Sequence, residues 1–137
     1  MQARLAVGAV IFGEAGSVLL VQRGEPPLAG TWSLPGGKVE PGEDVAAAVE
    51  REVLEETGLA VDAGPVIEIV TLSAEGFVYE IHEILCELRR PSPAPRAGDD
   101  ARAVTWIGAA GLDDLGVTPE VRRVIAMAQS LCRPRSP

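Results

Sequence analysis

The sequence is poor in cysteine and in long apolar runs, and each deficit excludes a class of protein. Two cysteines in 137 residues, Cys86 and Cys132, cannot build a disulfide framework, and their separation matches no zinc-ligand spacing. No apolar run approaches the roughly 18 residues that a membrane span needs. The N-terminus also lacks the basic start and the long apolar core of a signal peptide. We therefore expect a cytoplasmic protein with no membrane partner.

Basic residues are scarce as well. Twelve Lys and Arg stand against 20 Asp and Glu, which gives a net charge of −8 and a pI near 4.6. Proteins that bind nucleic acid need a surface rich in Lys and Arg to neutralise the phosphates, so nucleic acid is not an expected partner. An acidic protein that acts on a small phosphate compound must instead draw positive charge from a bound metal and a few arginines.

The chain does contain enough apolar residues for a core, since 47% of it is hydrophobic. This length and composition predict one folded domain over residues 1–132, with 133–137 as a frayed tail. The expected strands and helices mix without a regular alternation. That order indicates an α/β (α+β) fold with a mixed β-sheet and helices packed on it.

Local patterns predict the elements in turn. In the first half, strands over 5–12 and 17–22 should form a hairpin with its turn at 14–16, followed by a loop over 24–30. A short strand over 32–34, a turn at 35–37 and a helix over 45–57 should come next. The helix should be capped by Asp44 and end before Gly58. The second half should hold strands over 66–73, 77–88 and 103–107, a turn at 74–76, a loop over 91–98, and a helix from Thr118-Pro119 to about 131.

The first helix is unusually rich in glutamate towards its C-terminal end. Like charges three or four positions apart on a helix repel by roughly 0.2–0.5 kcal/mol per pair, and carboxylates near a helix C-terminus also meet the negative end of its dipole. Glu52, Glu55 and Glu56 are placed in this way. A compensating positive charge is therefore expected.

The position of these acids around the helix indicates which kind of positive group balances their charge. At 100° per residue, the three glutamates border an apolar stripe of valines rather than lie opposite it. The stripe consists of Val45, Val49 and Val53. A merely solvated acidic face would lie opposite the stripe, and buried carboxylates are usually paired or bound to metal. A divalent cation with oxygen ligands is the simplest compensator, and Arg51 is adjacent on the wheel.

This segment and its flanks resemble the Nudix box. Gly37, Glu43 and the run Arg51-Glu52-Val53-Leu54-Glu55-Glu56-Thr57-Gly58-Leu59 match the pattern Gx5Ex7REUxEExGU, in which U is a bulky aliphatic residue. The approach, residues 19–23 and 32–37, is also typical of the family. The resemblance implies a Nudix α/β/α sandwich in which the box forms a loop–helix–loop beside the sheet. It also implies a metal-dependent hydrolase that cleaves phosphate anhydrides of nucleotides.

The resemblance further implies a metal site for Mg²⁺ or Mn²⁺. Its ligands would be the side chains of Glu52, Glu55 and Glu56 and the backbone carbonyl of Gly36. Arg51 would orient this set, with Glu43 bonded back to Arg51 across two helical turns. The two glycines at 36 and 37 would let the backbone approach the substrate closely.

The general base is open between two parts of the chain. Glu52 is the first candidate. Asp99 and Asp100, after the proline-rich loop, are the alternative, although aspartate pairs in such loops are usually turn formers. His82 and Glu83 on a later strand are weaker candidates.

Contacts with the substrate are less constrained by the pattern. Arg23, at the end of the second strand, is a candidate phosphate contact and equally an ordinary surface charge. Gly37 and Trp32 are further candidates. The aromatic residues that could stack on a base are few, and a core role is favoured for each of them: Trp32, Phe77, Tyr79 and Trp106.

The first expected substrate is ADP-ribose, cleaved to AMP and ribose 5-phosphate, because residues 23–42 resemble bacterial Nudix proteins with that role. The chain lacks the proline after the box that marks many of these hydrolases, since Pro65 comes too early. The alternative is a MutT-like nucleoside triphosphate pyrophosphohydrolase that gives NMP and pyrophosphate. A non-catalytic nucleotide-binding module is a third interpretation of the function. The chain could also form a homodimer rather than a monomer.

Overall fold

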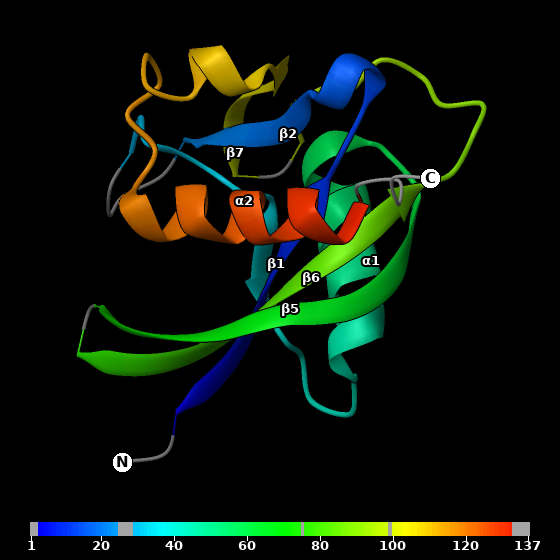
Figure 1. Ribbon diagram of the computed structural model, residues 1–137. Coiled ribbons are helices and arrows are strands. Elements are labelled where there is room, and N and C mark those ends of the chain that lie inside the picture. Colours follow the sequence, from blue (N-terminus) through cyan, green and yellow to red (C-terminus); the bar gives the residue numbers. More distant parts are fainter. Residues whose placement is uncertain (1–2, 25–28, 75, 99, 133–137) are drawn as a thin grey trace.

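The computed structural model describes residues 3–24, 29–74, 76–98 and 100–132 (Figure 1). The elements, in chain order, are β1 (Arg4–Ile11), η1 (Glu14–Gly16), β2 (Val18–Arg23), β3 (Trp32–Ser33), β4 (Gly36–Lys38), α1 (Val45–Thr57), β5 (Val61–Ala74), β6 (Phe77–Leu88), β7 (Ala101–Ile107), η2 (Ala109–Gly111) and α2 (Pro119–Cys132). The predicted tail, Asp99, and parts of the predicted loop at 24–30 and turn at 74–76 lie outside the described residues.

The strands form two sheets. The first, here called sheet A, has the order β4-β1-β6-β5, and the second, sheet B, has the order β3-β2-β7. In sheet A, β1 runs parallel to β6 while the other neighbours are antiparallel, so the sheet is mixed. The two helices lie on opposite sides of sheet A (Figure 1). The predicted mixed sheet between helices is therefore confirmed.

Alternation along β1 gives each helix its own apolar core. Val7, Ala9 and Ile11 are buried against α1, whereas Val10 is buried on the side of α2. Successive side chains of a strand point to opposite faces, so a central strand buried on both faces must be apolar at almost every position. The run from Ala6 to Ile11 satisfies this requirement.

Local signals set the limits of α1. The Asp44 side chain accepts a hydrogen bond from the Ala47 N–H at 2.8 Å, which satisfies a free donor of the first turn. Gly58 ends the helix in the left-handed conformation, with φ of 75°. Val49 and Val53 are fully buried, and each contributes roughly 1.5–3 kcal/mol by leaving water. The predicted range of 45–57 is confirmed.

The predicted hairpin between the first two strands is wrong. β1 and β2 share only an isolated bridge between Phe12 and Val18, and then diverge into different sheets. β6 pairs with β1 along its whole length, and β4 with the Pro35 carbonyl takes the other edge from Ala6 to Ala9, so β2 cannot pair along β1. A short connection between two apolar runs favours a hairpin locally, but the remote strands determine the pairing.

The predicted turn at 35–37 is also wrong, because Gly36 and Gly37 belong to β4 and pair with β1. A β-carbon at Gly36 would lie 2.0 Å from the Val7 carbonyl oxygen. The glycines therefore permit a close strand contact rather than a reversal of the chain.

Two strands begin earlier than predicted. β5 starts at Val61 rather than 66, and register shifts on both sides of Val66 interrupt its apolar pattern. β7 starts at Ala101 rather than 103. None of the described helices is long and apolar enough to cross a membrane.

Candidate active site

The C-terminal end of α1 is held by the loop that follows β6. The Arg96 N–H donates to the Thr57 carbonyl at 3.0 Å, and the Gly98 N–H donates to the Glu56 carbonyl at 2.9 Å. The last carbonyls of a helix have no partner within the helix, so these bonds satisfy them. The loop also brings Asp100 close enough for its charge to act on Glu56.

Arg51 forms the hydrogen-bonded centre of the acidic end of α1. Its Nε and Nη2 atoms donate to the two carboxylate oxygens of Glu43 at 2.7 and 3.0 Å. Its Nη1 atom donates to Glu52 at 2.8 Å and to Glu55 at 3.1 Å. Nη2 also donates to the Lys38 carbonyl at 3.0 Å, which ties the helix to β4. One guanidinium thus fixes three carboxylates and the neighbouring strand.

These bonds change the acidity of their partners. The hydrogen bonds from Arg51, reinforced by the backbone N–H of Glu40, lower the pKa of Glu43 to about 2. The same contact with Glu43 raises the pKa of Arg51 above its ordinary value. Both groups are therefore charged at neutral pH.

Glu56 is partly buried at the side of α1 that meets β4. It accepts a hydrogen bond from the Gly36 N–H at 2.7 Å, which joins the helix to β4 a second time. Burial, with the charges of Glu52 and Asp100, raises the pKa of Glu56 to about 7, although the Gly36 N–H and Arg23 act in the opposite direction. A partly buried carboxylate beside other acids is a position where a cation is strongly favoured.

Gly37 makes room for Glu52. A β-carbon at position 37 would lie 2.5 Å from the carboxyl carbon of Glu52. The first glycine of the box therefore allows the helix and β4 to approach with a carboxylate between them.

The predicted substrate contacts lie in different surroundings. Arg23 is exposed at the end of β2, and it is close enough to Glu56 for its positive charge to lower the pKa of that carboxyl. Trp32 is half-buried on β3 and packs against the core beneath α2. The predicted core role is wrong for Phe77, which is 38% exposed and carries the Arg4 guanidinium 3.6 Å from its ring centroid.

The donor set at the end of α1 fits a hard divalent cation, because it consists of oxygen atoms with an excess of negative charge. Among the residues that the structure describes, no three acidic, histidine or cysteine side chains converge on one point. The reason is visible in the contacts: Arg51 holds Glu52 and Glu55, while the Gly36 N–H holds Glu56. Binding of a cation would exchange some of these bonds for metal–oxygen bonds.

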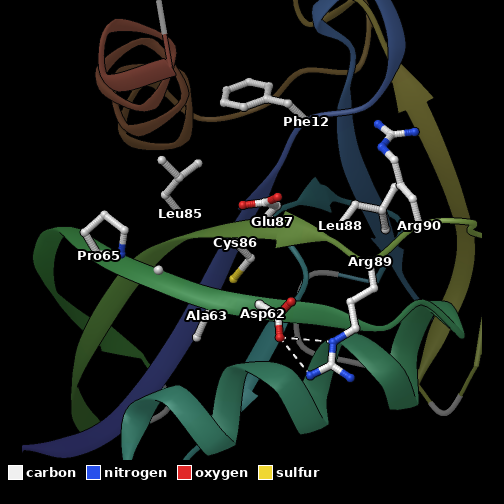
Figure 2. Close-up of a pocket in the computed structure, with 11 residues that line it drawn as sticks. Phe12, Asp62, Ala63, Pro65, Leu85, Cys86, Glu87, Leu88, Arg89 and Arg90 are labelled. Carbon is white, nitrogen blue, oxygen red and sulfur yellow. Dashed lines mark hydrogen bonds and ion pairs between the residues drawn. The ribbon is translucent and has the colours of Figure 1, made fainter.

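A separate cleft of about 780 Å³ lies where β5 begins and β6 ends (Figure 2). Arg89 in its wall is paired with Asp62 at 2.7 Å, and Arg90 points away from that pair. None of the lining residues belongs to segment 37–59. The cleft is therefore distinct from the acidic cluster.

Comparison with known proteins agrees with the motif. The family model of the NUDIX domain matches residues 2–127. The chain belongs to the Nudix family. A Mycobacterium tuberculosis protein named "Putative 8-oxo-dGTP diphosphatase 2" is 40% identical over 129 residues, which cover 89% of this chain and 84% of that protein.

Solved structures agree as well. A MutT Nudix hydrolase from Burkholderia pseudomallei is 31% identical, with a TM-score of 0.76 over 93% of this chain and 98% of that one. A Nudix hydrolase from Nitrosomonas europaea is 24% identical, with a TM-score of 0.80 over 96% and 92% of the two chains, and shows the shared fold. The protein is thus a Nudix pyrophosphohydrolase with a nucleotide substrate, of a family that uses divalent metals.

The sequence did not reveal how the box is held in place. The backbone donors of Arg96 and Gly98 and the Lys38 carbonyl all contact the Nudix helix or Arg51. Backbone groups carry no residue signature. The only available signal was general: the final carbonyls of a helix need partners, and a glycine in a nearby loop permits close approach.

Proposed function

We propose that this Nudix protein is a MutT-like nucleoside triphosphate pyrophosphohydrolase, which converts a nucleoside triphosphate to NMP and pyrophosphate. The observation that carries the proposal is the acidic cluster around Arg51 and Glu56, joined to the glycines of β4. The choice of substrate is supported by the Mycobacterium tuberculosis relative, whose name refers to 8-oxo-dGTP and which aligns with most of this chain.

In this proposal, Glu52, Glu55, Glu56 and the Gly36 carbonyl would hold Mg²⁺, or Mn²⁺, as oxygen ligands. When bound, the cation neutralises phosphate charge and lowers the pKa of a bound water. The support from the structure is the partly buried carboxylate of Glu56, which has neighbouring acids and accepts a hydrogen bond from the Gly36 N–H.

The chain's own residues would position the groups around the phosphates. Arg51 would keep Glu52 and Glu55 oriented, and Glu43 would fix Arg51 through its paired hydrogen bonds. Gly37 would leave the backbone open to the phosphate chain.

Proton transfer from the attacking water would be the task of an acid near Glu56. Glu52 is the first choice, since Arg51 holds it beside Gly37. Asp100 is the alternative, because the loop after β6 brings its charge within range of Glu56. Its neighbour Asp99 lies outside the described residues. A phosphate contact by Arg23 is supported by the effect of its charge on Glu56, and Trp32 would border the substrate from β3.

Product analysis tests the proposal. The protein is incubated with Mg²⁺ and separately with dGTP, 8-oxo-dGTP and ADP-ribose, and the products are identified by mass spectrometry. We expect dGMP or 8-oxo-dGMP together with pyrophosphate, and a kcat/KM for a triphosphate above that for ADP-ribose.

Two outcomes would contradict the proposal. A higher kcat/KM for ADP-ribose, with AMP and ribose 5-phosphate as products, would favour the substrate that residues 23–42 suggest. Binding of nucleotides with no turnover of any of them would indicate a binding module.

A further inference from the structure

Glu83, at the centre of β6, is a buried acid that the box does not use. Its residue is only 7% exposed. Within residues 3–24, 29–74, 76–98 and 100–132, it has no hydrogen-bonded or ion-paired partner; the nearest charge that acts on it is another acid, Glu68. Burial, with that neighbouring charge, raises the pKa of Glu83 to about 7. Buried carboxylates are rare unless paired. Among the described residues no fully enclosed side-chain oxygen lacks a partner, so the carboxylate of Glu83 is open to water or to a ligand.

The carboxyl group of Glu83 is directed across β1. Its Oε1 atom lies above Gly8, where a β-carbon would be only 2.0 Å away. Gly8 pairs with Glu83 on one side and with Gly36 on the other, and Ala6 is the next residue on the same face. The strip of β1 beside Glu83 therefore bears no side chain larger than a methyl group.

This strip lies on the face of sheet A that packs against α2. The Nudix helix α1 covers the opposite face (Figure 1). Alternation along the strands places Gly8 with Val10, and Glu83 with Leu85, both of which pack in the core beneath α2. Glu68 on β5 is bound by Arg123 of α2 at 3.1 Å. That ion pair supplies Glu68 with its own partner and leaves Glu83 without one.

Gly36, on the edge strand of sheet A, and Glu83 are close enough for one ligand to reach both. Gly36, whose N–H donates to Glu56, is on β4, and Glu83 is on β6, with β1 between them. Neighbouring strands are spaced about 4.8 Å apart, so the two points are separated by roughly 10 Å across the sheet. A nucleotide whose phosphates lie at Gly36 can extend its nucleoside over Gly8 towards Glu83.

A carboxylate has two oxygens that accept hydrogen bonds and, when ionised, no donor. It is complementary to two adjacent N–H donors. Among common purines, guanine presents this pair at N1 and the exocyclic N2 amine, hypoxanthine keeps only N1–H, and adenine has no such pair. We propose that Glu83 determines base specificity by accepting hydrogen bonds from the N1–H and N2–H of a guanine-type base. The inference rests on the proposed function for the location of the phosphates, and it specifies the base of the substrate.

Binding of reaction products tests this inference without turnover. The affinities of dGMP and dIMP, which differ only in the N2 amine, are measured by calorimetry at about pH 8, above the pKa of Glu83. We expect the wild type to bind dGMP about tenfold more tightly than dIMP, the usual effect of leaving a buried acceptor unpaired. Glu83→Gln should reduce this ratio to within about twofold, because an amide offers only one acceptor.

The matched control is Glu68→Gln. It removes a negative charge from the same face of the sheet, and its surface pair with Arg123 contributes little to stability. This variant should keep the dGMP preference. A second variant, Gly8→Ala, places a methyl group 2.0 Å from Oε1 of Glu83, so the carboxylate must move and the preference should be lost while Glu83 itself is kept. The inference therefore stays testable even if Glu83→Gln does not fold, and a retained preference in Gly8→Ala would contradict it.

The two proposals fail in different ways. If the wild type shows no dGMP preference, or if folded Glu83→Gln retains it, the role of Glu83 is wrong, whether or not the wild type hydrolyses dGTP. If the preference depends on Glu83 but wild-type protein with Mg²⁺ leaves dGTP intact, the base contact stands and the proposed hydrolysis is wrong.

Discussion

At the scale of single residues, Arg51 illustrates why a charge alone does not explain the Nudix box. Its guanidinium reaches Glu43 with two atoms while a third nitrogen contacts Glu52 and Glu55. A lysine ammonium has the same charge but cannot form this planar fork. Geometry rather than net charge therefore holds the acids in place.

Replacing Arg51 by lysine tests that statement. We expect Arg51→Lys to lower kcat by about 10- to 100-fold, the usual effect of losing a residue that orients metal ligands. Steady-state hydrolysis of a nucleotide with Mg²⁺ measures it. Arg89→Lys is the control, because Arg89 has the same kind of bond to Asp62 but on an exposed surface. Wild-type turnover by Arg51→Lys would contradict the role of the fork.

The lowered pKa of Glu43 predicts how the stability of the protein depends on pH. Its folded pKa of about 2 is lower than the ordinary value of 4.5, so its contribution to stability is present above about pH 4.5 and is lost as the pH falls through 2. Melting temperatures between pH 6 and pH 2 should show wild type more stable than Glu43→Gln at pH 6, with the difference shrinking towards pH 2. A difference that stays constant over this range would contradict the paired charge.

The residue-level predictions differ in how far sequence could support them. The contact of Arg51 with Glu55 follows from positions four apart on one helix, since residues one turn apart are neighbours. The contact with the adjacent Glu52 does not follow from this spacing. The proximity of Asp100 to Glu56 does not follow, because it depends on a loop that docks on the helix through backbone atoms. Glu83 appeared in the sequence as a minor candidate, and only its burial over Gly8 gave it a separate role.

At the scale of elements, the pairing of β4 with β1 joins the box to the sheet. Gly36→Ala should destabilise the protein by about 1–3 kcal/mol, because the new methyl group would meet the Val7 carbonyl at 2.0 Å and backbone must shift. Chemical denaturation measures the free energy of unfolding. Gly108→Ala is the matched control, since a β-carbon there meets nothing within 4 Å. Equal stabilities of the two variants would contradict the close pairing.

The elements, like the residues, differed in how well the sequence could predict them. The limits of α1 could be predicted because its cap, its apolar spacing and its terminal glycine are all local. The partners of β1 could not, because β4 and β6 come from distant parts of the chain and occupy both of its edges. The glycines at 36 and 37 were compatible with either a turn or a close strand, and only the fold decided between them.

At the scale of the whole molecule, many of the acidic residues gather at the C-terminal end of α1, where their repulsion lowers the stability of the metal-free protein. Glu56→Gln should raise the stability of the metal-free protein at about pH 8, above the Glu56 pKa of about 7, by on the order of 1–3 kcal/mol, or about 4 °C in Tm per kcal/mol, because it removes a partly buried charge near Glu52 and Asp100. Thermal melts in chelator measure this. Glu14→Gln, at an exposed position, changes net charge equally and should have no comparable effect.

The same melts with Mg²⁺ give the complementary result. Binding of a cation to the folded state should raise the Tm of the wild type and raise that of Glu56→Gln much less. An unchanged or lower metal-free Tm for Glu56→Gln would show that repulsion in the box is not a source of strain.

The architecture of the molecule was accessible from the sequence chiefly through the family resemblance. Composition and element order gave only a mixed α/β class, whereas the box implied the sandwich that the structure has. Neither the composition nor the box could predict the base of the substrate. The proposed base contact combines Gly8 of β1 with Glu83 of β6, and these residues become neighbours only when the parallel pair of strands forms.

The most direct test of the account is the Mg²⁺-dependent hydrolysis of dGTP by wild type and by Glu56→Gln, with products identified and folding checked by circular dichroism. The account predicts that the wild type releases dGMP and pyrophosphate, and that the folded variant turns over slower by about 10³-fold or more. Wild-type turnover by folded Glu56→Gln would contradict the assignment of the acidic cluster as the metal and reaction site.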